Sequence, residues 1–82
     1  MKVCFFASVR ERLDTAECAI EGEPLPADLD ALRAALAARG KAFAEVLAQP
    51  NLICAVNQQV VHGNVALAPG DEVAFFPPVT GG

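Results

Sequence analysis

EVAFFPPVTGG, residues 72–82, joins a hydrophobic strand pattern to a tail that cannot continue the strand. Glu72–Phe76 has the alternation and the β-branched and aromatic residues typical of a core strand. Pro77 and Pro78 fix φ and lack the amide N–H that strand pairing needs. We therefore expect pairing to end at Phe76 and the chain to continue in an extended form.

The tail, residues 77–82, ends in Val79, Thr80, Gly81 and Gly82. Glycine has no Cβ, so this backbone could pass through a channel too narrow for other residues. The six residues after the strand could reach roughly 20 Å from the folded body. We expect this tail to be flexible, with mobility from about Val79 onward. A Gly-Gly pair alone more often marks a frayed terminus, but after a core strand and a double proline it is more specific.

Chemistry at Gly82 would require activation. A free α-carboxylate has a pKa of roughly 3.3–3.7, so at neutral pH it is anionic and unreactive toward nucleophiles. It must first become an acyl-adenylate or a thioester. The tail therefore favours a protein whose terminal carboxylate enters an enzyme that performs this activation.

Length and composition indicate one small domain, residues 1–76, followed by the tail. The net charge of −4, with only six scattered Lys and Arg, argues against nucleic-acid binding and is compatible with basic protein partners. No apolar stretch approaches the roughly 20 residues of a membrane span. The start of the chain lacks a signal-peptide layout, so we expect a cytoplasmic protein without a membrane anchor.

Cys4, Cys18 and Cys54 are too few, and odd in number, for a disulfide framework. They are typical of small apolar residues in strands of a reduced, cytoplasmic protein. No metal site is expected, since the cysteines share no close spacing and only His62 could add a fourth ligand. His62 lies in a predicted loop without a neighbouring acid, Ser or Cys to orient it, so we interpret it as a solvated residue.

The beginning of the chain predicts a β-hairpin with a long connection. The first strand is Lys2–Ala7 (KVCFFA), with apolar residues on both faces, and the second is Ala16–Ile20. Between them, Ser8–Asp14 predicts a loop with a short helical turn. Ser8 could cap this turn, with Glu11 completing a capping box.

The middle of the chain predicts two helices. Asp28 is a good N-cap for the main helix, and Gly40 suits the C′ position at its end. Asp30 and Arg33 are expected to form a surface pair of little energetic value. A shorter helix is predicted over Lys41–Ala48. Residues at helical spacing along the main helix are Leu29, Leu32, Ala35, Leu36 and Arg39, and the leucine stripe is expected to pack on the sheet.

The last part of the chain predicts three strands. Leu52–Val56 (LICAV) is a continuous apolar run and therefore a buried strand. Asn57-Gln58 predicts a tight turn, because Asn tolerates positive φ, and it leads into a short strand, Gln59–Val61. Pro69–Asp71 predicts the turn before the final strand, Glu72–Phe76.

This order of elements predicts an α+β fold of the β-grasp, or ubiquitin-like, type. Two strands precede the crossover helix and further strands follow it, which gives a mixed sheet with the main helix across one face. In that layout the first and last strands are parallel neighbours in the centre of the sheet.

The two central strands have apolar residues on both faces, although helices cover only one. If Val3, Phe5, Val73 and Phe75 face the helix, Phe6 and Phe76 lie side by side on the uncovered face. Val60 could extend this patch. Clustered exposed aromatic residues mark a protein interface, although a loop could instead cover one or both rings.

Three stretches of the chain resemble the small subunits of molybdopterin synthase, the sulfur carriers of molybdenum cofactor biosynthesis. They are residues 5–7 (FFA) with Arg10-Glu11, residues 55–58 (AVNQ) and residues 70–82 (GDEVAFFPPVTGG). The last of these is a specific family signature. Between Pro24 and Asn51 only the helix pattern is shared.

The resemblance implies a subunit that is not an enzyme on its own and binds no cofactor permanently. An adenylyltransferase related to ubiquitin-activating enzymes would use ATP to adenylate Gly82. A persulfide donor would then convert Gly82 to a thiocarboxylate, whose sulfur is a better nucleophile than the carboxylate oxygen.

The same resemblance implies two successive protein partners. The tail would thread into the large catalytic subunit of the synthase, within a heterotetramer. There it would give sulfur to cyclic pyranopterin monophosphate to build the molybdopterin dithiolene. The residues expected to contact partners are Phe6, Val60, Phe76 and Arg10.

Three other functions remain open from the sequence. A sulfur carrier of another pathway, such as thiamine thiazole synthesis, uses the same fold and the same Gly-Gly thiocarboxylate. A ubiquitin-like modifier would instead be linked to lysines through an isopeptide bond. A plain interaction domain would tolerate deletion of Gly82, whereas a carrier would not.

Overall fold

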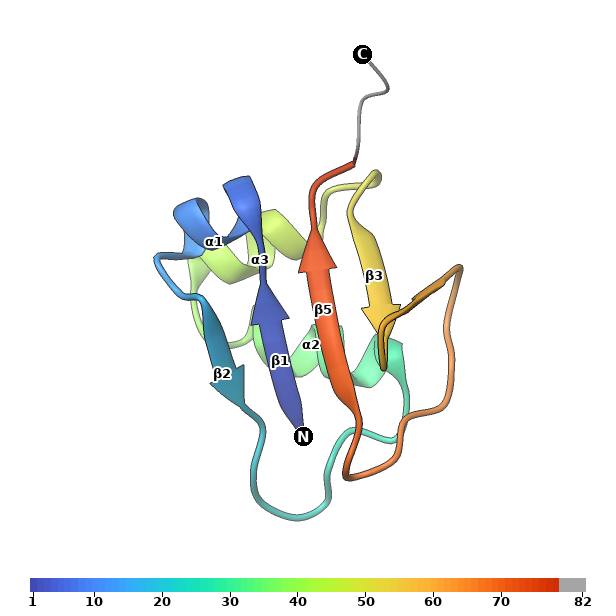
Figure 1. Cartoon of the computed structure of the whole chain (residues 1–82). Coiled ribbons are helices and arrows are strands. Elements are labelled where there is room, and N and C mark those ends of the chain that lie inside the picture. The colour runs from blue at the N-terminus through green and yellow to red at the C-terminus, as the bar shows by residue number, and fades with distance from the viewer. Residues whose placement is uncertain (79–82) are drawn as a thin grey trace.

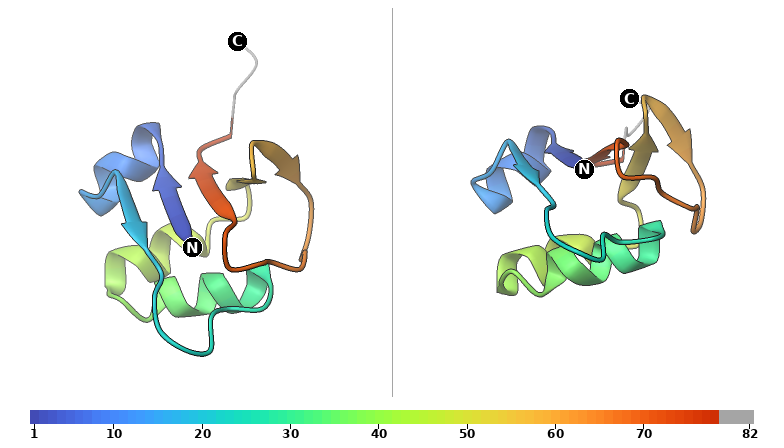
Figure 2. Two further views of the ribbon diagram at one scale, coloured as in Figure 1. Left: turned by 60° about the horizontal axis from the view of Figure 1, so that its bottom comes forward. Right: turned by 90° about the horizontal axis from the view of Figure 1, so that it is seen from below.

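The computed structural model describes residues 1–78 and has the α+β architecture that the sequence predicts. A five-stranded mixed sheet has the strand order β2-β1-β5-β3-β4, and the helices α2 and α3 cover one of its faces (Figures 1 and 2). In chain order the elements are β1 (Lys2–Phe5), α1 (Ala7–Leu13), β2 (Glu17–Ala19), α2 (Leu29–Ala37), α3 (Lys41–Leu47), β3 (Ile53–Val56), β4 (Gln59–Val61) and β5 (Glu72–Phe76).

The two central strands, β1 and β5, are parallel, with Val3 opposite Val73 and Phe5 opposite Phe75. β2 and β3 flank them in antiparallel orientation, and β4 pairs only with β3. The predicted β-grasp layout, with the first and last strands side by side in the centre, is confirmed. The last strand also has the predicted bounds.

The core lies between this sheet and the helices. Phe5 and Phe75 stack with ring centroids 6.1 Å apart, and Phe43 of α3 meets Phe5 edge-on at 6.0 Å. Burying each such ring contributes about 1.5–3 kcal/mol to folding. The fully buried side chains of the sheet and of α2 include Val3, Val73, Leu29, Leu32 and Leu36.

The first connection differs from the prediction. The strand ends at Phe5 rather than Ala7, and residues 7–13 form a complete helix, α1, instead of a loop with a single turn. Phe6 occupies the N-cap position without a side-chain cap, so the predicted Ser8 capping box is wrong. The physical reason is packing: Val9 and Leu13, one helical turn apart, are both buried in the core.

The main helix begins as predicted and ends differently. Asp28 accepts a hydrogen bond from the Ala31 amide at 2.8 Å, which is the expected N-cap. The helix ends at Ala37, and Gly40 occupies the N-cap position of α3 with extended backbone at φ 165°. The predicted C′ role of Gly40 is therefore wrong, because the chain turns directly into α3. Arg39 lies beyond α2, and its Nη2 donates to the Ala19 carbonyl at 3.2 Å.

The expected surface pair of Asp30 and Arg33 does not form. Arg33 instead places its guanidinium carbon 5.7 Å from the centroid of the Phe75 ring, on the core side of the sheet. The ion pairs among residues 1–78 are Lys2–Glu17, Arg12–Glu45 and Lys41–Glu45, and the five side chains in them are largely exposed. Pairs of this kind contribute little to stability.

Within residues 1–78, no helix has the length and apolar character that crossing a membrane requires. After β5, Pro77 is half-buried and Pro78 is exposed. The predicted mobility from Val79 onward concerns residues outside this described range.

Candidate functional site

The face of the sheet opposite α2 and α3 has no helix against it (Figure 2, right). Side chains on this face alternate with those of the core along each strand. We call it the open face and define it by Cys4, Phe6, Ile53, Ala55, Val60, Ala74 and Phe76, as the strand register places them.

The floor of the open face consists of small side chains. The register aligns Cys4, Ala74, Ala55 and Val60 in one row across four strands. Cys4 is 7% exposed and Ala55 is 6% exposed, although no helix covers them. They are buried because larger neighbours on the same face stand above them, which leaves a shallow apolar floor between raised side chains.

The raised side chains are apolar as well. Phe6 is 50% exposed and Val60 is 54% exposed, and they are the exposed large hydrophobic residues of the described chain. The Phe6 amide donates to the Phe75 carbonyl at 3.1 Å, so Phe6 continues the β1–β5 register by one position and lies at the level of Phe76. Phe76 is half-buried and paired with Ile53. The open face therefore has the composition of an interface core.

The chain leaves the sheet at the end of the open face that carries Phe6. β5 is held between β1 and β3 up to Phe76, so the residue before Pro77 cannot move without breaking the centre of the sheet. Figure 1 shows the chain continuing beyond the end of β5, on the side where β1 also ends. The predicted threading residues Val79, Thr80, Gly81 and Gly82 lie outside the described residues, so the structure does not describe their positions.

The other end of β5 is fastened by a hydrogen-bonded cluster. Asn57 Nδ2 donates to Asp71 Oδ1 at 2.9 Å, and the Glu72 amide donates to Asn57 Oδ1 at 3.1 Å. Asp71 Oδ2 also accepts from the Ala68 amide at 2.8 Å. These bonds hold the pKa of Asp71 below its usual range, with the Ala68 amide as the largest cause and Asn57 next.

This cluster gives a structural role to Asn57 and Asp71, which lie in two of the stretches that carry the family resemblance. Sequence reasoning placed Asn57 in a tight turn, which the structure confirms, since Asn57 and Gln58 have φ of 51° and 70°. It did not find the link from Asn57 to Asp71. Asn57 and Asp71 are 14 residues apart in the sequence. They come together only because β3 pairs with β5.

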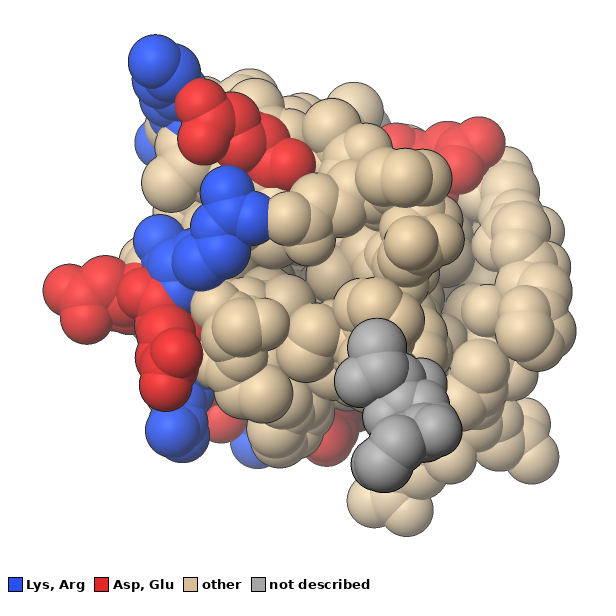
Figure 3. Space-filling view, turned by 90° about the horizontal axis from the view of Figure 1, so that it is seen from above, with Lys and Arg blue, Asp and Glu red and all other residues tan. Residues whose placement is uncertain are grey.

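The register also places charged side chains on the open face, with Lys2 and Glu72 at the end away from Phe6 and Glu17 beside Cys4. Arg10 is exposed on α1, as expected for a partner contact, and Arg12 on the same helix reaches Glu45 at 4.0 Å. Figure 3, a view onto the end of the sheet where β1 and β5 end, shows charges gathered mostly on the side of α1 and an uncharged surface across the middle of that end. An uncharged centre beside a charged rim is the usual anatomy of a protein interface.

The three thiols are free and unsuited to act as nucleophiles. Cys4 and Cys54 are buried and Cys18 is partly buried. Burial raises the pKa of all three thiols, that of Cys54 to about 11. Because the thiolate is the reactive form, these cysteines are poor sulfur acceptors at neutral pH.

The remaining candidate ligand, His62, is exposed after β4, as predicted. Among residues 1–78, no three His, Cys, Asp or Glu side chains gather in a group that could hold a metal ion. The described residues therefore bring an exposed, partly apolar sheet face and the end of β5 to the same side of the molecule.

Sequence comparisons agree with this geometry. A family model described as the ThiS family matches residues 3–82. A molybdopterin synthase sulfur carrier subunit from Escherichia coli K12 is 45% identical over 82 residues, covering 100% of this chain and 99% of the relative. A subunit of the same name from Haemophilus influenzae is 42% identical with the same coverage.

Two solved structures share the fold. SAMP1 from Haloferax volcanii superposes with a TM-score of 0.81 at 24% identity, covering 100% of this chain and 98% of the other. A complex of subunits 1 and 2 of the molybdopterin-converting factor from Helicobacter pylori 26695 contains a chain with a TM-score of 0.69 and 27% identity. That match covers 99% of this chain and 96% of the other.

Proposed function

This chain belongs to the ThiS family, and from that premise we propose that it is the sulfur carrier subunit of a molybdopterin synthase. The observation that carries the proposal is the full-length likeness to proteins of that name, at 45% and 42% identity. The geometry supports it, because an apolar docking face lies at the same end of the sheet as the start of the tail.

In this proposal the carboxylate of Gly82 is the reactive group. An activating partner joins it to AMP from ATP and releases pyrophosphate. The terminal sulfur of a persulfide donor then displaces AMP and forms an acyl disulfide. A thiol attacks the donor's sulfur in that S–S bond, so the donor leaves as a disulfide with the thiol and the thiocarboxylate remains on Gly82. Its sulfur is softer and more nucleophilic than the carboxylate oxygen, so it can add to the pterin precursor, cyclic pyranopterin monophosphate.

The described residues contribute positioning rather than chemistry. Pro77 and Pro78 keep the chain extended as it leaves β5, and this extension directs the tail away from the sheet. The open face, with Phe6, Phe76 and Val60, docks first the activating enzyme and then the large synthase subunit, and Arg10 contacts both from α1. Because both partners use one face, activation and sulfur delivery are mutually exclusive.

The Helicobacter pylori complex supports a partner of this kind, since its two chains are subunits of one molybdopterin-converting factor. We propose that this chain likewise assembles with a large catalytic subunit, as a heterotetramer in the cytoplasm.

Intact mass spectrometry tests the proposal. The full chain is incubated with a family adenylyltransferase, ATP and a persulfide source, and the expected product has one carboxylate oxygen replaced by sulfur. Two variants are matched controls: deletion of Gly82, and the addition of one residue after it. Both should fold as the wild type and gain no sulfur, because only the reacting group is displaced. Sulfur loading of either variant would exclude Gly82 as the acceptor.

The same experiment distinguishes a carrier for another pathway. A thiocarboxylate that forms but yields no dithiolene with the large synthase subunit and the pterin precursor would assign the chain to a different thiolated product. Isopeptide conjugates found after denaturing purification would instead assign it to protein modification.

A further inference from the structure

Ala7 has an unusual backbone conformation for an alanine. Its φ is 53°, in the left-handed region that L-residues other than Asn and Asp seldom adopt. The other non-glycine residues with positive φ among residues 1–78 lie where such angles are common. Asp14 closes the C-terminus of α1, and Asn57 and Gln58 form the turn between β3 and β4. Ala7 instead lies at the first position of a helix.

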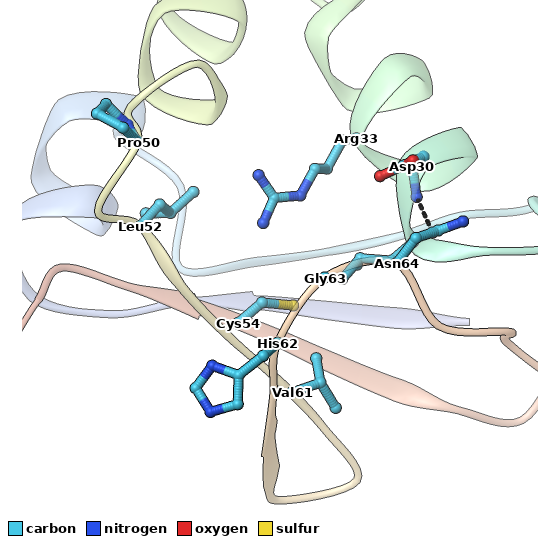
Figure 4. Close-up of a pocket in the computed structure, with 10 residues that line it drawn as sticks. Asp30, Arg33, Pro50, Leu52, Cys54, Val61, His62, Gly63 and Asn64 are labelled. Carbon is cyan, nitrogen blue, oxygen red and sulfur yellow. Dashed lines mark hydrogen bonds between the residues drawn. The ribbon is translucent and has the colours of Figure 1, made fainter.

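The side chain of Ala7 does not explain this conformation. Ala7 is exposed, so its methyl group is not held in the core. The hollow beneath α2, between that helix and the β3–β4 hairpin, does not explain it either, because none of the residues that line this hollow belongs to β1 or α1 (Figure 4). The conformation is therefore imposed by the backbone on either side of Ala7.

Both neighbours of Ala7 are fixed in place. On one side, the Phe6 amide donates to the Phe75 carbonyl at 3.1 Å, so the pairing with β5 continues up to Phe6. On the other side, Val9 is buried in the core, so α1 must begin directly after the strand. The Phe6 carbonyl accepts from the amides of Val9 and Arg10, at 3.1 and 3.4 Å. One left-handed residue thus joins the strand to the helix without a connecting loop.

This junction sets the position of Phe6 relative to Arg10. α1 packs against α3 and β5 and lies at the end of the sheet where β5 also ends (Figure 1). The half-exposed ring of Phe6 and the exposed side chain of Arg10 therefore come from a backbone that is fixed beside the start of the tail. Fixing contact residues before binding improves affinity, because less conformational entropy is lost when the partner docks.

We propose that Ala7 is a positioning residue for partner docking, whose left-handed backbone presents Phe6 and Arg10 together to one partner. The inference rests on the proposed function, since it takes the open face as the docking surface for the large synthase subunit. Residues in disfavoured backbone conformations persist only where the surrounding structure determines them, and they cluster at functional sites.

A set of substitutions separates the backbone angle from other properties of this position. Ala7→Val should weaken binding to the large synthase subunit at least about tenfold, because a β-branched residue resists positive φ and shifts the junction. Ala7→Gly adopts positive φ freely and should bind within about threefold of the wild type. Ser8→Val is the matched control, since it places the same side chain at the next exposed position of α1, where φ is not positive. It should bind as the wild type does in isothermal titration calorimetry.

A double-mutant cycle shows whether Ala7 acts through Phe6. In the Phe6→Ala background, Ala7→Val should weaken binding much less than it does in the wild type, because the ring that it displaces is gone. Independent losses that multiply in the double variant would overturn the proposal, and so would wild-type affinity in Ala7→Val. These two outcomes leave the open face as the docking surface. Wild-type affinity in Phe6→Ala would overturn both the positioning role and the docking surface on which it rests.

Two further measurements decide the question if Ala7→Val does not fold. The urea midpoint of Ala7→Gly should be no lower than that of the wild type, because glycine destabilises a helix at ordinary φ but relieves strain at positive φ. Hydrogen exchange should show the amides of Val9 and Arg10 protected in the free chain. A lower midpoint in Ala7→Gly would overturn the proposal. Protection of these amides only in the complex would also overturn it, since Phe6 would then not be positioned before binding.

Discussion

Two pairs of phenylalanines, adjacent in sequence, lie on opposite faces of the same two strands. Phe5 and Phe75 are 1% and 0% exposed and stack beneath the helices, whereas Phe6 is 50% exposed and Phe76 is half-buried on the open face. Residue type is the same in both pairs, so only the face differs. The inner pair holds the domain together, and the outer pair leaves apolar area for a partner to bury.

The largest effect is expected from removing an inner ring. Phe75→Ala should lower the free energy of unfolding by about 3–5 kcal/mol, because loss of a fully buried ring leaves a cavity beside Phe5. That loss is a large part of the total stability of a domain this small. Urea denaturation followed by circular dichroism measures it.

Phe76→Ala is the matched control for this prediction. Its ring is only half-buried, so the cost should be about 1–2 kcal/mol at most. Equal destabilisation by the two substitutions would mean that the open face contributes to the core as much as the helix-covered face does.

Substitutions in the outer pair are expected to weaken partner binding rather than to lower the free energy of unfolding. Phe6→Ala should leave the free energy of unfolding within about 1 kcal/mol of the wild type, since half of the ring is already in water. It should weaken binding to the large synthase subunit by about 10- to 100-fold, as truncation of an interface aromatic does. Isothermal titration calorimetry with the large subunit measures this.

Val60→Ala, at the far edge of the same floor, removes less apolar area and should weaken binding by less than Phe6→Ala does. Wild-type affinity in both variants would show that the open face is not the docking surface.

The division between the two faces was predictable from the sequence because alternation in a strand is strict. After their first residues, Lys2 and Glu72, the strands KVCFF and EVAFF are apolar at every position, and a single helix layer can cover only half of these residues. The β-grasp order, the parallel centre and the exposure of Phe6 and Val60 follow from that argument and are confirmed.

Features that depend on distant neighbours were not predictable in the same way. α1 forms because Val9 and Leu13 reach the core, although its N-terminus has no side-chain cap. Arg33 turns away from Asp30 toward Phe75 because the hollow beneath α2 admits it. Gly40 begins α3 instead of ending α2. Local sequence carries no signal for such contacts, since each depends on an element far along the chain.

A smaller effect is expected at the hydrogen-bonded end of β5. Asn57→Ala should lower the free energy of unfolding by about 1–2 kcal/mol, because it removes two hydrogen bonds and places an alanine at positive φ. Asn57→Gly removes the same bonds without the backbone strain and should cost less. Urea denaturation of both variants separates the two contributions, and identical losses would assign the whole effect to the hydrogen bonds.

The smallest expected effect is on the pH dependence of folding stability, through Asp71 at that same end of β5. The folded-state pKa of Asp71 lies below its usual value of about 3.9, chiefly through the hydrogen bond from Ala68. The unfolded chain therefore takes up the proton first as the pH falls. The stability that Asp71 contributes is fully present above about pH 4–5 and is lost as the pH falls through the lower, folded pKa.

Asp28 has a lowered pKa as well, through its bonds to Ala31 and Asn64, so the wild type loses stability in acid at both sites. Denaturation midpoints measured from pH 7 to pH 3 should therefore fall less steeply in Asp71→Asn than in the wild type. Asp28→Asn serves as the second control, and the double variant should show the shallowest fall. If Asp71→Asn leaves the fall of the midpoint with pH unchanged, the folded chain stabilises the ionised carboxylate no more than the unfolded chain does. The bonds from Ala68 and Asn57 would then fix the geometry of β5 without favouring its charge.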